Sequence, residues 1–386
     1  ISVWGHDFRP AFRRILNLVK LLPQNLPVLA TTATATKRVQ LDIEKQISGD
    51  INTLRGELIR ENFGLYVIKV QSEDEKLLWL AENIAQLEGT GIIYTGTRVN
   101  TEIYSRWLEF LGVDTSEYNA GLDSDSRIEI EQGLMDNRWK AVISTNALGM
   151  GIDKSDIRFI IHTQIPASPI HYYQEIGRAG RDGKSTKLIL FYNSTKDNKG
   201  IEEDYKLPKA FIDGGRPRIK NYQKVINALK QEQLGERQIM KITNLKPTQV
   251  RVIKADLIEQ GIIKEVIYDR SKKYEYQFNA PELNTKTFDE LRELKISELN
   301  AMLEYVNLND SRMKFLCDYL GDTSQTSFKN CDNTDLVKYL IHVKEDTKQK
   351  LVEFRETYFP ELKVETQSSN IVNGVAASFY GVSSVG

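Results

Sequence analysis

Short apolar runs alternate with amphipathic stretches through the first half of the chain. Four runs are short and almost wholly apolar, as expected for strands buried on both faces: residues 91–95, 141–145, 159–162 and 188–192. Four stretches repeat apolar side chains about one helical turn apart, which predicts helices: residues 37–47, 76–87, 99–111 and 169–176. This alternation predicts an α/β fold with a doubly wound parallel sheet, in which ligands sit at the carboxyl ends of the strands. Hydroxyl- and glycine-rich stretches follow several of these runs, at residues 31–36, 95–98 and 144–153.

The pattern changes after residue 192. Residues 193–217 are rich in Asp, Asn, Gly and Pro and are predicted to be a connection. The next stretch predicts three helices and a hairpin, the order of a winged-helix unit: helices 219–230, 236–244 and 247–260, then strands 262–268 and 273–278. Residues 287–320 are again expected to be helical, and the stretch from about residue 365 is expected to be a loose tail.

The distribution of charge along the chain is more informative than the net charge. Lys and Arg total 52 and Asp and Glu total 53, so the net charge of −1 does not announce a nucleic-acid partner. Between residues 206 and 254, however, twelve basic residues stand against three acidic ones. Such a stripe is typical of a protein that binds a phosphate backbone, although it also suits the solvated face of a helical domain. Within it, Arg251 and Lys254 would lie on the recognition-type helix of the winged-helix unit, and DNA is the favoured partner.

Composition narrows the class of protein. The 386 residues suffice for several domains, and no apolar run approaches the roughly 18–20 residues of a membrane span. The two cysteines, Cys317 and Cys331, exclude a disulfide scaffold and a four-cysteine zinc site, and they fit a reducing cytoplasm.

The most specific string runs from residue 172 to residue 183 and contains Gln-x-x-Gly-Arg-x-Gly-Arg. Its arginines, Arg178 and Arg181, are three residues apart, and their planar guanidinium groups can neutralise a transferring γ-phosphate. Arginine pairs on helices more often meet carboxylates, but the whole string is too long to arise easily by chance. A second string, at residues 144–153, would bring Gly151 close to phosphate or nucleic acid and leave Asp153 to accept from a ribose hydroxyl or from Arg178.

Together these strings resemble helicase superfamily two, and within it the RecQ family of DNA helicases. Residues 1–10 resemble the aromatic-rich loop of that family, which implies that they sense single-stranded DNA and couple it to ATP hydrolysis. Residues 32–35 resemble the motif that follows, and residues 91–98 resemble the first motif of the second lobe. Residues 118–122 continue that motif, although Asn119 stands where the family usually has His.

The resemblance implies two sets of site residues. The nucleotide set is Gly151, Asp153, Gln174, Arg178 and Arg181, of which the two arginines are the catalytic candidates, with ATP and Mg²⁺ as cofactors of the intact enzyme. In the DNA set, aromatic rings would stack on bases while basic and hydroxyl groups meet phosphates. This set is Trp4, His6, Phe8, Arg9, Thr32, Thr34, Arg98, Thr145, Asn146, Arg251 and Lys254.

Residues 298–334 resemble the zinc subdomain of the family. Its four ligand positions would hold Ser311, Phe328, Cys331 and Thr334. One thiol cannot hold a structural zinc ion, which needs four nitrogen or sulfur ligands, so no zinc is expected. The winged-helix-like unit also precedes this subdomain, whereas in the best-known members it follows.

A motor of this class needs a phosphate loop and an Asp-Glu pair that binds magnesium. Neither is present, because the near-match at residues 183–185 has Arg178 where the first glycine should be. In the family the Asp-Glu-Ala-His run comes just before the position of Ile1. We therefore expect a helicase with an N-terminal truncation, inactive by itself. The alternative is a catalytically inactive DNA-binding module that lost these motifs naturally.

Five regions are expected from this resemblance. They are a remnant of the first RecA-like lobe (1–62), the second RecA-like lobe (63–205), the winged-helix-like domain (206–283), the helical zinc-derived subdomain (284–345), and a helix with a flexible tail (346–386). The resemblance implies an ATP-dependent helicase that unwinds DNA 3′ to 5′ in recombination and repair. Its expected partner is single-stranded and partly duplex DNA, and we expect a monomer in the cytoplasm, associated with a bacterial nucleoid.

Overall fold

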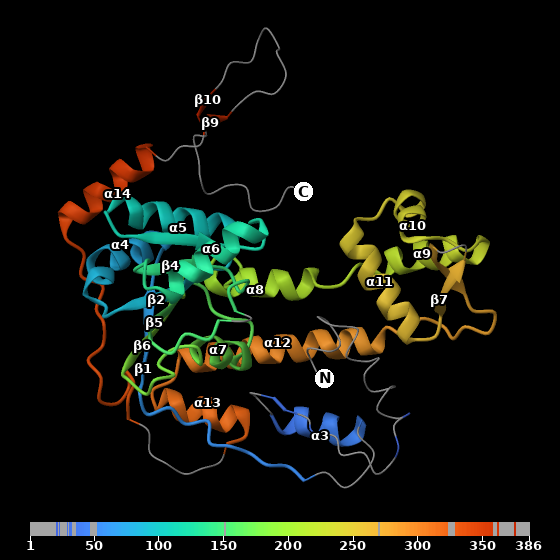
Figure 1. Cartoon of the computed structure of the whole chain (residues 1–386), viewed down its shortest axis with the longest axis horizontal. Coiled ribbons are helices and arrows are strands. Elements are labelled where there is room, and N and C mark those ends of the chain that lie inside the picture. The colour runs from blue at the N-terminus through green and yellow to red at the C-terminus, as the bar shows by residue number, and fades with distance from the viewer. Residues whose placement is uncertain are drawn as a thin grey trace.

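A fully parallel six-stranded sheet forms the centre of the computed structural model (Figure 1), in the order β1-β6-β5-β2-β4-β3. The structure describes residues 21, 23, 29, 31–32, 36–46, 52–149, 152–268, 271–322, 329–357, 361–362 and 374–375. The strands are β1 (Phe63–Val70), β2 (Thr90–Tyr94), β3 (Thr115–Tyr118), β4 (Ala141–Ser144), β5 (Ile157–His162) and β6 (Thr186–Asn193). The predicted doubly wound α/β sheet is therefore confirmed, and it is the sheet of a RecA-like lobe.

The helices that connect these strands begin at short polar side chains. They are α4 (Glu73–Asn83), α5 (Arg98–Phe110), α6 (Ser124–Met135) and α7 (Pro169–Ile176). Each is preceded by a residue whose side-chain oxygen accepts from a backbone N–H of the first turn: Ser72, Thr97, Asp123 and Ser168. Such caps satisfy backbone donors that the helix itself cannot, and they fix where each strand-to-helix loop ends.

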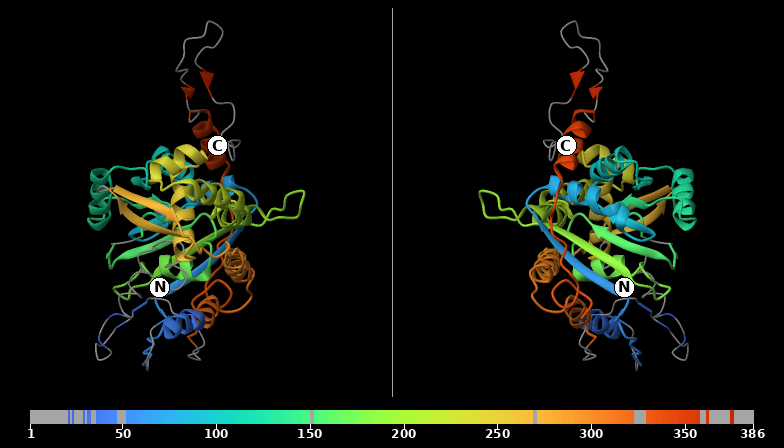
Figure 2. Two further views of the ribbon diagram at one scale, coloured as in Figure 1. Left: turned by 90° about the vertical axis from the view of Figure 1, so that its right-hand side faces the viewer. Right: turned by 90° about the vertical axis from the view of Figure 1, so that its left-hand side faces the viewer.

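Helices cover both faces of the sheet, and the C-terminal half of the chain contributes to each layer. On one face α7 packs with α12 (Lys286–Val306) and α13 (Arg312–Leu320), whose apolar side chains share a core with β2, β4 and β6. On the other face α4 and α5 pack with α14 (Glu345–Thr357), where the Phe354 ring lies 5.2 Å from that of Trp107. Figure 2 shows α12 and α13 together below the sheet.

The segment predicted as a plain connection contains a helix, so that prediction was wrong. Helix α8 (Glu203–Gly214) forms there although it includes Pro208. It is anchored by Asp204, whose carboxylate oxygens both lie 3.1 Å from Nζ of Lys76 on α4. Lys76 is 1% exposed and also donates to the carbonyl oxygen of Thr163 at 2.6 Å. This buried tertiary anchor stabilises a helix that local sequence does not favour.

The Asp204 carboxyl makes the stability of the lobe depend on pH. Burial raises its pKa to about 6, against the opposing effect of the Lys76 ammonium. Folding therefore favours the protonated form, and this contribution is complete below the ordinary Asp pKa and is lost as pH rises through 6. We expect the stability of the wild-type chain relative to Asp204→Asn to fall between pH 4 and pH 7, by at most about 1.4 kcal/mol per pH unit. Urea unfolding across this range measures the difference, and parallel pH profiles for the two proteins would contradict the expectation.

A second unit lies beside the sheet and is joined to it by α8 and α12 (Figure 1). It contains α9 (Ile219–Gln231), α10 (Glu236–Thr243), α11 (Pro247–Glu259) and an antiparallel hairpin of β7 (Ile263–Tyr268) and β8 (Ser271–Tyr276). The unit has its own core, which includes Tyr222, Ile239, Val250 and Leu257. The element order is the one predicted, and its assignment as a winged helix stays a prediction.

The remaining elements are short or peripheral. Helix α3 (Lys37–Gln46) confirms the helix predicted at residues 37–47. Strands β9 (Glu361–Leu362) and β10 (Gly374–Val375) pair with each other, and the rest of the predicted tail lies outside the described residues. Within the part of the chain that the structure describes, no helix is both long and apolar enough to cross a membrane.

Candidate functional site

The carboxyl edge of the sheet gathers the residues of the two specific strings. Arg178 follows α7 directly, and a Cβ added at Gly149 would lie 3.0 Å from a terminal nitrogen of its guanidinium. Gly149 belongs to the loop that follows β4, so this glycine allows the loop and the arginine to approach closely. The hydroxyl of Tyr94, at the end of β2, donates to the carbonyl oxygen of Leu148 at 3.0 Å in the same loop. The fold thus brings the two strings together, as the sequence predicted.

The second arginine of the string is already paired. A terminal nitrogen of Arg181 donates to a carboxylate oxygen of Asp153, whose side chain is 86% exposed. The prediction that Asp153 could meet Arg178 is not what the structure shows, because Asp153 binds Arg181 instead. An exposed pair of this kind contributes about 0–1 kcal/mol and exchanges readily for another anion. Gln174 lies half-buried on α7, and Gly151 is outside the described residues.

A buried histidine that belongs to neither string, His162, lies at the same edge of the sheet. Nε2 of His162, at the end of β5, lies 2.9 Å from a carboxylate oxygen of Glu175 on α7. The His162 ring stacks on Tyr94, with centroids 5.1 Å apart, and meets the edge of Tyr172 at the same distance. His162 and Glu175 are 13 residues apart in the sequence, so only the tertiary structure reveals the pair.

Three of the predicted DNA-binding residues come together at the same edge. Thr145 and Asn146 follow β4, and the exposed side chain of Arg98 opens α5 after the neighbouring strand β2. The Arg98 guanidinium reaches the turn at Gly121, where an added Cβ would lie 2.9 Å from it. Thr32 is described and exposed, while four other residues of the set lie outside the described part of the chain: Trp4, His6, Phe8 and Arg9. Thr34 lies outside it as well.

Comparison with known proteins supports the same assignment. Residues 75–183 match the family described as the helicase conserved C-terminal domain. The ATP-dependent DNA helicase RecQ of Bacillus subtilis is 40% identical over 195 residues, which cover 50% of this chain and 32% of that protein. Over this region the chain is similar to helicases of the RecQ family. The RecQ of Pasteurella multocida is 32% identical over 238 residues, covering 61% of this chain and 35% of its own. The chain therefore spans about a third of the length of these relatives.

Solved structures of helicases align with the chain at lower similarity. The Saccharomyces cerevisiae protein Dbp5 bound to RNA and ADP BeF3 aligns with a TM-score of 0.43 and 20% identity, over 63% of this chain and 61% of that one. A DEAD box protein from Methanococcus jannaschii aligns with a TM-score of 0.37 and 20% identity, over 53% of each chain.

The structure argues against one of the predicted DNA contacts, Lys254. Lys254 is 7% exposed, and its Nζ lies 2.5 Å from a carboxylate oxygen of Glu236 and 2.9 Å from the hydroxyl of Tyr274. A lysine held in this way has no free donor on the surface. Arg251, one turn earlier on α11, is 71% exposed and lies 3.6 Å from Glu236, so its guanidinium stays accessible.

Fewer basic residues between positions 206 and 254 are unpaired in the structure than the count along the sequence suggests. Five of these basic residues pair with carboxylates, several of which come from outside residues 206–254: Lys206, Lys209, Arg216, Arg251 and Lys254. The seven others are exposed: Arg218, Lys220, Lys224, Lys230, Arg237, Lys241 and Lys246. Counting charge along the sequence missed the carboxylates that folding brings in, such as Asp256 beside Arg216 at 2.7 Å.

The positions equivalent to the zinc ligands of the RecQ family have other partners. Ser311 caps α13 by accepting from the backbone N–H of Lys314. The Cys331 thiol lies 3.4 Å from the Thr334 hydroxyl, and Phe328 is outside the described residues. Next to Cys331 in the sequence, Asp332 accepts a hydrogen bond from Nε of Arg312 at 2.5 Å. Elemental analysis of the purified chain is expected to find far less than one zinc per molecule, and stoichiometric zinc would overturn this expectation.

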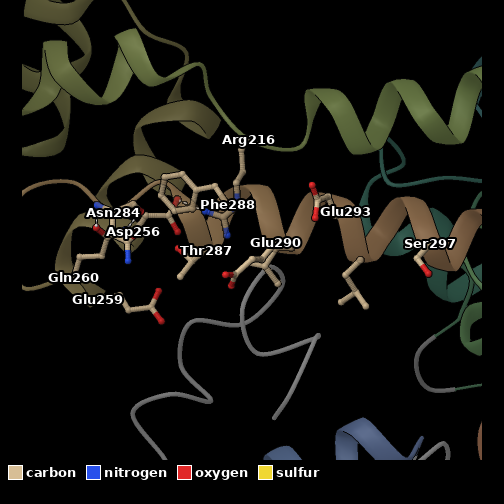
Figure 3. A pocket seen from close by; sticks show the side chains of 12 residues that line it. Arg216, Asp256, Glu259, Gln260, Asn284, Thr287, Phe288, Glu290, Glu293 and Ser297 are labelled. Carbon is tan, nitrogen blue, oxygen red and sulfur yellow. Dashed lines mark hydrogen bonds and ion pairs between the residues drawn. The ribbon is translucent and has the colours of Figure 1, made fainter.

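Two hollows among the described residues lie away from these positions. One separates α11 from the first half of α12 (Figure 3) and has a volume of about 670 Å³. Its lining carries the carboxylates of Asp256, Glu259, Glu290 and Glu293 against the single guanidinium of Arg216. This excess of negative charge does not suit a DNA backbone. The nucleic-acid candidates are therefore the carboxyl edge of the sheet and the exposed cations of the second unit.

Proposed function

We propose that this chain is the second motor lobe, with its C-terminal domains, of an ATP-dependent DNA helicase of the RecQ type. The observation that carries the proposal is Arg178, which stands at the carboxyl edge with no carboxylate paired to it among the described residues. A half-buried guanidinium without an anionic partner is suited to a phosphate. The names of the relatives, ATP-dependent DNA helicases, agree with this chemistry.

In this proposal the two arginines complete an ATP site built mainly by a first lobe. Arg178 and Arg181 would neutralise charge on the transferring γ-phosphate, with Gln174, Gly151 and Asp153 beside them. The described residues present no cluster that would hold Mg²⁺, so the ion would be bound by the phosphate loop and acidic pair of the first lobe. In this proposal the two arginines supply transition-state stabilisation.

We also propose how DNA is bound and where the protein works. Single-stranded DNA would cross the edge at Arg98, Thr145 and Asn146, and partly duplex DNA would reach the exposed cations of the second unit. Unwinding would run 3′ to 5′ in recombination and repair, by a monomer in the cytoplasm at the nucleoid. The five regions expected from the sequence are kept as the proposed domain boundaries.

A DNA-stimulated ATPase assay tests the proposal. The 386-residue chain should not turn over ATP, whereas a longer protein that supplies a first lobe with its phosphate loop should do so when single-stranded DNA is added. Substantial turnover by the chain alone would contradict the assignment of the missing motifs. The alternative, an inactive DNA-binding module, predicts that both proteins bind DNA and that neither hydrolyses ATP.

Arg251 gives a test of DNA binding on the second unit. Replacing Arg251 by alanine should weaken binding to any DNA sequence and reduce the slope of log affinity against log salt by about 1, because one phosphate contact is lost. Fluorescence anisotropy at several salt concentrations measures both quantities. Lys348→Ala, on α14 at the opposite side of the sheet, is the matched control and should leave the slope unchanged. An unchanged slope for Arg251→Ala would remove α11 from the DNA interface.

A further inference from the structure

Arg178 lies close in sequence to a carboxylate that it does not bind. Glu175, in the last turn of α7, precedes it by three residues, and the backbone N–H of Arg178 donates to the Glu175 carbonyl oxygen at 3.3 Å. Glu175 and Arg178 both influence the pKa of the Tyr94 hydroxyl, so both lie near it. The Glu175 carboxylate nevertheless accepts from His162, at 2.9 Å. The neighbouring arginine, Arg181, is paired with Asp153, so neither nearby carboxylate neutralises Arg178.

His162 is fixed firmly enough to hold Glu175 in place. Its side chain is 2% exposed and lies between the rings of Tyr94 and Tyr172. Its Nδ1 is buried and has no hydrogen-bond partner among the described residues. A bare lone pair there costs less than a buried N–H without an acceptor, so we assign the proton to Nε2, which donates to Glu175.

The consequence for Arg178 is that no carboxylate takes its donors. Its Nε is buried and has no partner in the described part of the chain, the guanidinium forms a hydrogen bond with Tyr94, and a terminal nitrogen faces the loop at Gly149. Unpaired donors beside a glycine loop are what an incoming phosphate oxygen requires.

We propose that His162 is a positioning residue that keeps Glu175 away from Arg178, and so keeps Arg178 available for a phosphate group of a nucleoside triphosphate. The inference rests on the proposed function for the identity of the ligand, but the competition between His162 and Arg178 for Glu175 does not. Without His162, the carboxylate would turn to the arginine and block the position that the phosphate needs.

The availability of Arg178 can be measured directly on the 386-residue chain. Phenylglyoxal modifies accessible guanidinium groups, and peptide mass spectrometry gives the rate at each arginine. In His162→Phe the rate at Arg178 should fall about fivefold, since an ion pair at a partly exposed site is worth up to about that factor. His162→Gln keeps an N–H donor for Glu175 and should retain the wild-type rate.

The double variant separates positioning from packing. In His162→Phe/Glu175→Gln the side chain at 175 carries no charge to capture Arg178, so the rate should return to within about twofold of wild type. A rate that stays low in the double variant would overturn the proposal, because the effect would then come from lost packing. An unchanged rate in His162→Phe would overturn it as well. Thermal unfolding and the rate at Arg106, an exposed arginine on α5, check that each variant is folded.

Inorganic tripolyphosphate separates this inference from the proposed function. It should protect Arg178 from phenylglyoxal in the wild-type chain and in the double variant, and less in His162→Phe. If the rates respond to His162 as expected but tripolyphosphate gives no protection, the competition for Glu175 stands and the phosphate role of Arg178 fails.

Discussion

Replacing Asp332 by alanine is expected to lower the free energy of unfolding by about 3–5 kcal/mol. Asp332 accepts from Nε of Arg312 at 2.5 Å, and Arg312 is only 3% exposed. The same carboxylate accepts from the backbone N–H of Val67 on β1 at 2.9 Å. The alanine variant would leave a buried guanidinium without its counter-charge and a strand amide without its acceptor. Urea unfolding followed by circular dichroism measures the loss.

The control for this prediction is an exposed pair of the same chemistry. Lys314 and Asp318 lie 2.5 Å apart on α13, with side chains more than half exposed. Asp318→Ala should cost about 0–1 kcal/mol, because water screens the pair and solvates the remaining lysine. If Asp332→Ala cost no more than Asp318→Ala, the buried pair would not be a structural anchor.

Replacing Arg178 by alanine is expected to reduce DNA-stimulated ATP hydrolysis by about 10³-fold or more in a longer protein with an intact phosphate loop. The reason is that the guanidinium would neutralise charge that develops on the γ-phosphate during transfer. DNA binding should change little, because Arg178 lies behind the Gly149 loop and not among the exposed cations. Steady-state ATPase and anisotropy assays on the same preparation give both values.

Two variants make the result interpretable. Arg178→Lys keeps the charge but not the planar pair of donors, and should recover only part of the rate. Arg106→Ala removes an exposed arginine that pairs with Glu102 on α5, and should leave the rate unchanged. Comparable rates for Arg178→Ala and Arg106→Ala would show that Arg178 takes no part in hydrolysis.

The sheet could be predicted where burial dominates the sequence. Strands β4, β5 and β6 are buried on both faces and read as apolar runs, so they were found. Strands β1 and β3 lie at the two edges of the sheet and were missed. β3 is only four residues long and is mostly polar, with Glu117 half-buried, whereas β1 is almost wholly apolar apart from the exposed Lys69 and was missed although its pattern suits a strand. Edge strands such as β3 mix polar and apolar positions, which weakens the pattern that identifies a strand.

The site could be predicted only as far as it is contiguous in the sequence. The string around Arg178 was found because its residues are neighbours in the chain. The partner of Glu175 was not found, because Glu175 lies on α7 whereas His162 lies at the end of β5. Lys254 was assigned to DNA because a helix pattern does not reveal that Tyr274 and Glu236 will surround it. In each case the missing information is a tertiary contact between elements far apart in sequence.

The segment at residues 329–336 has a consequence for self-association. It runs beside β1, where Asn330 accepts from the backbone N–H of Leu65 at 3.1 Å and Asp332 donates back to the Leu65 carbonyl at 3.0 Å. Without it, the open side of β1 would present unpaired amides and carbonyls to any passing strand. The loss of this segment by proteolysis or mutation would turn a protected sheet into a template for edge-to-edge aggregation. Residues 329–336 would thus protect the edge strand β1 from pairing with another chain.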